Sequence, residues 1–265
     1  MKTLKIGIST CPNDTYIFGA AIRNDIHYPF KLVGVMDDVQ LLNNQAIKQS
    51  LDIVKVSFGV YNEIKDNYKI LKSGGALGFG CGPLLVAPNS HKTINSIKGG
   101  KVAIPGKHTT AFTVFKMFFP ELADNVYEVR FDKIMPAVEA GEFDAGLVIH
   151  EGRFTYKSYG LHRLADMGEL WEERFHKPIP LGFIALHKKY LDMADHINQM
   201  IRDSIIFARQ HTDKTWEYVK KYAQDMDDNV IGSHISLYVN EYSLDLTNAA
   251  DAIGQFIGET DSVFC

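Results

Sequence analysis

The order of apolar and polar positions along the chain predicts alternating strands and helices in its first part. Apolar runs predict strands at residues 5–9, 30–36 and 53–58, and helical spacing predicts helices at 16–22 and 39–49. The apolar run at 53–58 is typical of a buried parallel strand. Such an alternation indicates a mainly parallel sheet that is covered by helices.

A similar alternation resumes after a short strand expected at residues 84–87, and it predicts a second sheet. The elements expected there are a strand and loop at 101–106, a helix at 111–119, a strand at 127–131, a helix at 134–140 and a strand at 145–149. A strand at 183–186 should then lead into a C-terminal part with a predominantly helical pattern.

These patterns predict two α/β lobes. Lobe one would consist of residues 1–88 and 181–265, and lobe two, residues 89–180, would be inserted between them. A chain of 265 residues also exceeds the usual single core of roughly 100–200 residues. Because open α/β sheets bind ligands at the carboxyl ends of their strands, we expect a two-lobe, periplasmic-binding-protein-like fold with a ligand cleft between the lobes.

The composition of the chain limits which partners and which cellular compartment are expected. A net charge of −4, from 28 basic and 32 acidic residues without long runs of either sign, disfavours nucleic acid and anionic membranes as partners. No apolar run approaches the roughly 20 residues of a membrane span, and no signal-peptide region is evident. Cys11, Cys81 and Cys265 lack a CxxC spacing and an even count, which favours a reducing compartment over disulfides or structural zinc. We therefore expect a cytoplasmic protein in which Cys11 and Cys81 are buried and inert.

Candidate ligand-binding residues occur at one predicted helix start and one predicted strand end. Thr109 and Thr110 precede an apolar helix, where amide groups, hydroxyls and the helix dipole would hold an anion such as a carboxylate; simple capping by one threonine is the alternative. Lys55 and Ser57 share one face of a strand and could point toward a ligand. The alternative is a lysine that extends to the surface and a serine that begins a turn.

His150 is the candidate base, because it directly follows the apolar strand at residues 145–149. Its ordinary pKa of about 6.5 suits proton abstraction at neutral pH, and the neighbouring Glu151 could orient or tune it. Asn13 and Asp14, in the first β/α loop, could hydrogen-bond a polyhydroxylated ligand or could cap the following helix.

Several common sites have no signature in this sequence. The chain lacks GxGxxG, GxxxxGK[ST], HExxH and GxSxG motifs. We therefore expect no cofactor and no metal, and a small carboxylated molecule as the partner.

Four short motifs occur in order along the chain: STCPNDT at 9–15, KVS at 55–57, GKHTTA at 106–111 and VIHEGR at 148–153. Together they resemble the 1,4-dihydroxy-6-naphthoate synthase family of the futalosine route to menaquinone, and the resemblance covers essentially the whole chain. It implies a carbon–carbon lyase that cleaves cyclic dehypoxanthinyl futalosine to 1,4-dihydroxy-6-naphthoate and a three-carbon fragment. It also implies that His150 is the proton acceptor and that the substrate is bound by Lys55, Val56, Ser57, Thr109 and Thr110.

Two other functions remain open at this stage. The sister activity of the same pathway dehydrates chorismate to a 3-enolpyruvylbenzoate, and incubation with chorismate would detect it. A non-catalytic solute-binding module would share the fold, because fold alone does not define function. Such a module would need no base at the position of His150.

Overall fold

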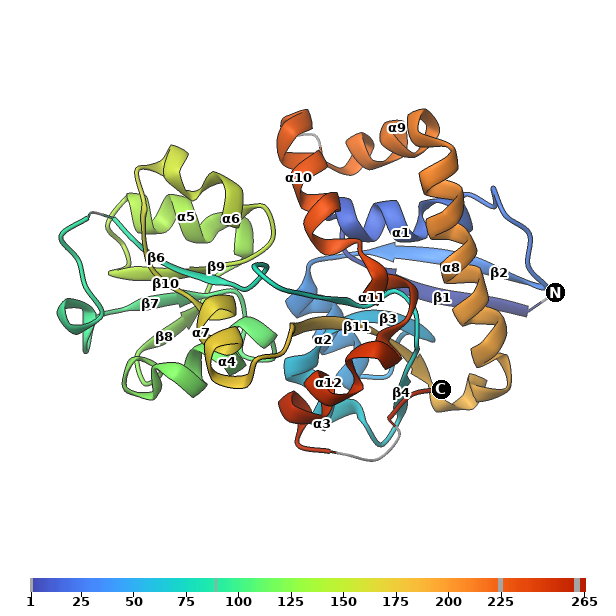
Figure 1. Cartoon of the computed structure of the whole chain (residues 1–265), viewed down its shortest axis with the longest axis horizontal. Coiled ribbons are helices and arrows are strands. Elements are labelled where there is room, and N and C mark those ends of the chain that lie inside the picture. Colours follow the sequence, from blue (N-terminus) through green and yellow to red (C-terminus); the bar gives the residue numbers. More distant parts are fainter. Residues whose placement is uncertain (1, 89, 224–225, 260–262) are drawn as a thin grey trace. The chain divides into compact units, whose positions relative to one another are not determined.

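The protein is described by a computed structural model that covers residues 2–88, 90–223, 226–259 and 263–265 (Figure 1). The chain divides into two compact units, which we call unit 1 (Met1–Gly78 with Pro180–Cys265) and unit 2 (Phe79–Ile179). Unit 2 is continuous and is inserted into unit 1, so that the chain passes twice between them.

Unit 2 begins earlier than the sequence analysis placed the inserted lobe, at Phe79 instead of residue 89. The reason is strand β6 (Leu84–Ala87), which pairs with β9 (Ala145–Val148) and β10 (His162–Asp166) in the sheet of unit 2. Periodicity identified this strand but carries no information about its partner strands. Residue 89 itself lies outside the described residues.

The sheet of unit 1 is mixed. Its strands run in the order β2-β1-β3-β11-β4, and β5 also pairs with β11. Their bounds are β1 Lys2–Ile8, β2 Phe30–Met36, β3 Ile53–Ser57, β4 Tyr68–Ile70, β5 Ala76–Gly78 and β11 Ile179–His187. β1 is parallel to both β2 and β3, as predicted, whereas β11 is antiparallel to β3 and β4. The expectation of a mainly parallel sheet was therefore wrong, because β11 enters from the second passage of the chain, which local periodicity does not orient.

Both faces of the unit 1 sheet are covered by apolar side chains. Phe183 and Ala185 of β11 lie in one hydrophobic cluster, while Ile184 and Leu186 lie in another. Because successive side chains of a strand point to opposite faces, β11 is packed on both sides. Apolar burial on this scale is the main favourable contribution to folding. It holds the strands in place, and with them the loops at their ends.

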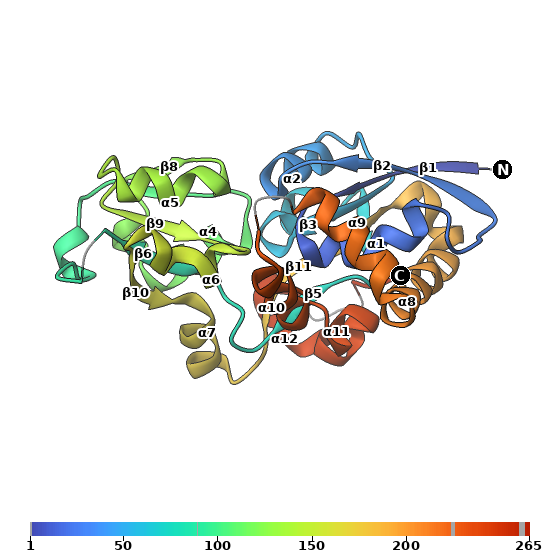
Figure 2. The ribbon, with the colours of Figure 1, turned by 90° about the horizontal axis from the view of Figure 1, so that it is seen from above.

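The C-terminal part of the chain is predominantly helical, as predicted. The helices of unit 1 are α1 Pro12–Ile22, α2 Val39–Ile47, α3 Tyr61–Ile64, α8 Ala194–Gln210, α9 Thr212–Tyr222, α10 Asp228–Tyr238, α11 Glu241–Leu244 and α12 Ala250–Ile257. α1 packs against α8, α9 and α10, so the two ends of the chain build one layer together (Figures 1 and 2). Among the described residues, no helix combines the length and apolarity that a membrane span requires.

The sheet of unit 2 has the strand order β10-β6-β9-β7-β8, with β7 at Val102–Ile104 and β8 at Val126–Glu128. β7 is parallel to β8 and β9, whereas β6 is antiparallel to β9 and β10. The helices of this unit are α4 Thr110–Phe118, α5 Phe131–Glu139, α6 Gly152–Thr155 and α7 Met167–Phe175.

Several element boundaries differ from those predicted, and two of the differences have a local cause. α1 begins at Pro12 instead of residue 16, because proline lacks an N–H group and its fixed φ suits the first helical position. The segment at residues 127–131 was predicted to be a strand, but β8 ends at Glu128 and α5 begins at Phe131. Short β-like patterns are ambiguous at an element boundary, where neighbouring packing decides.

Candidate functional site

A buried ion pair joins the first β/α loop of unit 1 to strand β3. Nζ of Lys55 lies 3.2 Å from Oδ1 of Asp14 and donates to the carbonyl oxygen of Gly74 at 3.0 Å. Oδ2 of Asp14 accepts from the amide (3.1 Å) and the hydroxyl (2.7 Å) of Ser9. The side chains of Lys55 and Asp14 are only 8% and 2% exposed. Lys55 therefore does not extend to the surface, and both charges have fixed partners.

Asn13 leaves one polar atom of this loop without a partner. Its Nδ2 donates to Oδ1 of Asp14 at 3.1 Å, whereas its own Oδ1 is buried and, within the described part of the chain, has no hydrogen-bond partner. The N-cap of α1 is Cys11, so neither Asn13 nor Asp14 caps that helix. Because buried acceptors are rarely left unpaired in proteins, Oδ1 of Asn13 is suited to accept a hydrogen bond from a ligand hydroxyl.

Ser57 is held by a residue that the sequence analysis missed. Nδ2 of Asn43, on α2, donates to the Ser57 hydroxyl at 3.3 Å, and the Ser57 amide donates to Oδ1 of Asn43 at 3.0 Å. Strand alternation places Ser57 on the same face as Lys55. The side chain of Val56 points the other way and is fully buried in a hydrophobic cluster. Val56 thus contributes to the core with its side chain.

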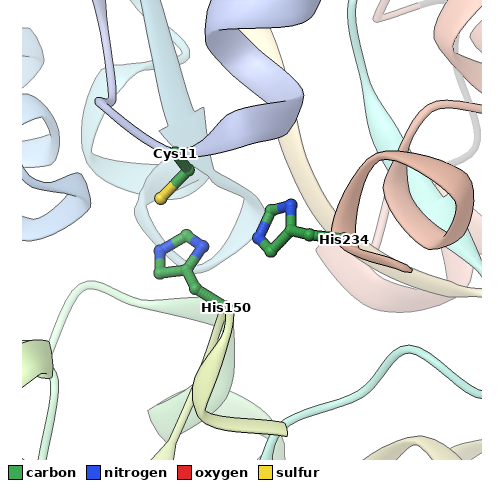
Figure 3. Close-up of side chains that lie close together, drawn as sticks. All are labelled: Cys11, His150 and His234. Carbon is green, nitrogen blue, oxygen red and sulfur yellow. The ribbon is translucent and has the colours of Figure 1, made fainter. Parts of the chain in front are cut away.

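His234 is a second residue that the sequence analysis assigned no role. It lies on α10, and a ring nitrogen of His234 and the sulfur of Cys11 are within 4.8 Å of each other (Figure 3). Both residues are buried, so Cys11 has a histidine neighbour that its sequence context does not reveal. Two ligand atoms are fewer than the three or four protein ligands of zinc sites, and the pair alone does not define a metal centre.

Cys81, in unit 2, behaves as the sequence analysis predicted. Burial raises the pKa of its thiol to about 12. Because the thiolate is the nucleophilic form of cysteine, this side chain stays protonated and inert at neutral pH.

His150 occupies a strained turn directly after β9. Its φ of 53° lies in the left-handed region, which residues other than glycine seldom adopt. The imidazole packs edge to face against the ring of Phe131, with 5.3 Å between the ring centroids. Figure 3 shows the side chain leaving this turn. Strained backbone is concentrated at functional sites, where the surrounding structure maintains it, and His150 is therefore the strongest candidate for chemistry in unit 2.

Arg153 anchors the turn that carries His150. Its Nη2 lies 2.6 Å from Oδ2 of Asp166, and its Nη1 donates to the carbonyl oxygen of Gly82 at 2.8 Å. Asp166 is fully buried and also accepts from the amide of Gly168 at 2.8 Å, at the start of α7. Charge-assisted hydrogen bonds of this kind are strong and directional. The sequence showed Arg153 only as part of a motif. In the structure it ties the turn to Gly82, just before β6, and to Asp166, the last residue of β10.

Thr109 is the N-cap of α4. Its hydroxyl accepts from the amide of Phe112 at 3.2 Å and donates to the carbonyl oxygen of Gly106 at 2.6 Å. The helix itself begins at Thr110, which is buried. The capping alternative therefore describes Thr109 in this structure, and the positive end of the helix dipole remains the feature that would attract an anion here.

Thr109→Val should lower the free energy of unfolding by about 1 kcal/mol, because loss of the N-cap hydroxyl leaves the Phe112 amide unpaired. Thr109→Ser keeps the hydroxyl and should stay near the wild-type value. Urea titration followed by circular dichroism measures both variants. A Thr109→Val protein as stable as the serine variant would contradict the capping role.

Known proteins with similar sequences show the family of this chain. The sequence pattern of a family described as menaquinone biosynthesis matches residues 4–260. The chain belongs to the menaquinone biosynthesis family. The 1,4-dihydroxy-6-naphthoate synthase of Thermus thermophilus is 38% identical over 264 residues, which cover 99% of this chain and 95% of the relative. The protein of the same name from Streptomyces coelicolor is 39% identical over 249 residues, covering 92% and 87%. The resemblance stated from the four motifs is thus confirmed.

Solved structures agree with the predicted fold. A protein from Archaeoglobus fulgidus has a TM-score of 0.89 and 30% identity, covering 97% of this chain and 96% of its own. The periplasmic aliphatic sulphonate binding protein SsuA of Escherichia coli has a TM-score of 0.64 and 13% identity, covering 99% and 90%. The second likeness concerns the fold alone. It confirms a periplasmic-binding-protein-like α/β fold for this member of the menaquinone biosynthesis family, while the ligand cleft stays a prediction.

Proposed function

We propose that this chain is a 1,4-dihydroxy-6-naphthoate synthase, a carbon–carbon lyase of menaquinone biosynthesis. Its substrate would be cyclic dehypoxanthinyl futalosine, and its products 1,4-dihydroxy-6-naphthoate and a three-carbon fragment. The observation that carries this proposal is the near full-length similarity to two proteins of that name. The family match over residues 4–260 supports the same pathway.

His150 is the proposed base of the reaction. Removal of a substrate proton with expulsion of a carbon fragment requires a positioned base and no redox cofactor, because formation of the aromatic product supplies driving force. An imidazole is well suited to this step at neutral pH. The strained turn at His150 and its anchoring by Arg153 support the assignment.

The proposed substrate contacts come from both units. In unit 1, Lys55 and Ser57 would contact the substrate, Val56 would do so through its backbone, and Asp14 would keep Lys55 in place. Oδ1 of Asn13 would accept a hydroxyl of the sugar-derived part. In unit 2, the helix start at Thr109 and Thr110 would hold the carboxylate, as helix N-termini hold anions elsewhere.

A turnover assay followed by mass spectrometry tests the proposal. The purified protein is incubated with cyclic dehypoxanthinyl futalosine and, in parallel, with chorismate. We expect 1,4-dihydroxy-6-naphthoate from the first reaction and no enolpyruvylbenzoate from the second. Product from chorismate alone would establish the sister activity, and binding without any turnover would establish a solute-binding module.

The proposed location is the cytoplasm. Cys11, Cys81 and Cys265 are free thiols, and disulfides are rare where glutathione keeps thiols reduced. Immunodetection in fractionated cells tests this, because recovery in the periplasmic or membrane fraction would contradict it.

A further inference from the structure

The carboxyl group of Glu151 is buried in unit 2, directly after His150. Its Oε2 is inaccessible to solvent and, within the described residues, has no hydrogen-bond partner. Glu151 precedes the short helix α6, and its side chain makes no capping hydrogen bond there. An ionised carboxylate without partners is costly to bury. The neutral, protonated form of Glu151 avoids that cost.

The charges around Glu151 favour the same form. Burial is the main cause that raises the pKa of Glu151 to about 7; a hydrogen bond from its own backbone opposes the rise, and repulsion from Asp132 on α5 adds to it. The cations on that helix and its N-cap are already engaged, since Arg130 lies 2.6 Å and Lys133 3.6 Å from carboxylate oxygens of Asp132. On the turn itself, Arg153 is paired with Asp166.

The proposed cleavage needs a proton donor as well as a base. His150 accepts a hydroxyl proton from the three-carbon part of the substrate, and the electron pair of that O–H bond forms a carbonyl group on the leaving fragment as the carbon–carbon bond breaks. The electron pair of the carbon–carbon bond moves toward a carbonyl oxygen, which becomes a hydroxyl of the aromatic product only after it receives a proton. One proton thus leaves the substrate and one arrives, and sites of this kind pair groups whose environments separate their pKa values.

We propose that Glu151 is the general acid of this site and that its Oε2 donates the proton to the substrate carbonyl oxygen while His150 acts as the base. The inference rests on the proposed function and deepens it. The hydrogen bonds of Arg153 to Asp166 and Gly82 anchor the backbone that directly follows Glu151. After product release, the imidazole gives up its proton and the carboxylate takes one up, which restores the starting protonation states.

Glu151→Gln is the decisive variant, because it keeps the shape of the side chain and removes the transferable proton. We expect kcat for cyclic dehypoxanthinyl futalosine to fall by roughly 10²-fold or more, with little change in KM. The wild-type kcat should also decline above pH about 7 as Glu151 loses its proton, and this alkaline limb should be absent from the Gln variant. Glu142→Gln, an exposed site on the same unit, is the matched control and should behave as wild type.

Two kinetic outcomes would overturn the assignment. The first is a Gln variant with wild-type kcat, and the second is a slow Gln variant that keeps the alkaline limb, which would indicate a structural role. A carboxyl carbon NMR titration of Glu151 provides a readout that needs no turnover. An ordinary pKa there contradicts this inference alone, whereas a wild-type protein that does not convert the substrate contradicts the proposed function.

Discussion

Replacement of His150 should lower the turnover of cyclic dehypoxanthinyl futalosine by about 10²–10⁴-fold, the usual contribution of a general base. His150→Asn is the preferred variant, because asparagine tolerates the left-handed backbone at this position, where φ is 53°. The loss should appear in kcat and little in KM, because the imidazole stabilises the transition state of proton transfer and contributes little to substrate binding. Steady-state kinetics with mass-spectrometric detection of the naphthoate measures both parameters.

The matched control is His162→Asn, which replaces an exposed histidine on β10 of the same unit. We expect this variant to retain full turnover. His150→Gly adds a second comparison, because glycine relieves the positive φ and should be at least as stable as the wild type. A folded His150→Asn protein with nearly unchanged turnover would rule out this histidine as the base.

Removal of the Asp14 carboxylate should produce the largest loss of stability among the changes considered. Asp14→Leu leaves the Lys55 ammonium buried without its carboxylate partner, and breaking a buried pair from one side typically costs about 3–5 kcal/mol. The Ser9 amide and hydroxyl lose their acceptor as well. Guanidinium titration of the purified variant gives the change in free energy of unfolding.

A double-mutant cycle measures the coupling free energy between Asp14 and Lys55 apart from their interactions with other residues. Lys55→Met should also destabilise, whereas Asp14→Leu combined with Lys55→Met should recover part of the loss, because no unpaired charge then remains buried. Lys31→Met, at an exposed position of β2, is the control for the loss of a lysine. Strictly additive effects of the two single substitutions would show that Asp14 and Lys55 are not energetically coupled.

Local periodicity was sufficient for most of the elements. Strands β2 and β6 lie at the predicted residues, because their apolar runs are bounded by turn-forming residues. The β/α alternation was enough to predict two lobes and the parallel pairing of β1 with β2 and β3, but not the antiparallel strand β11 that makes the sheet mixed. The position of His150 after a strand also followed from the pattern, although that strand ends at Val148.

Partners across the fold could not be predicted in this way. Period-two alternation shows which face of β3 carries Lys55, but only the packed loop supplies Asp14 and the Gly74 carbonyl. The neighbour of Cys11 is His234, on a helix from the other end of the chain. Such contacts depend on how distant segments pack, and no local pattern encodes that packing.

The sequence by itself determined the element order, the family and the identity of the candidate base. Tertiary structure alone decided that β6 belongs to unit 2, that Thr109 caps α4, and that Oε2 of Glu151 is buried without a hydrogen-bond partner among the described residues. The physical reason is that periodicity and capping signals act over a few residues, whereas strand partners, hydrogen-bond satisfaction and desolvation depend on groups that only the folded chain brings together.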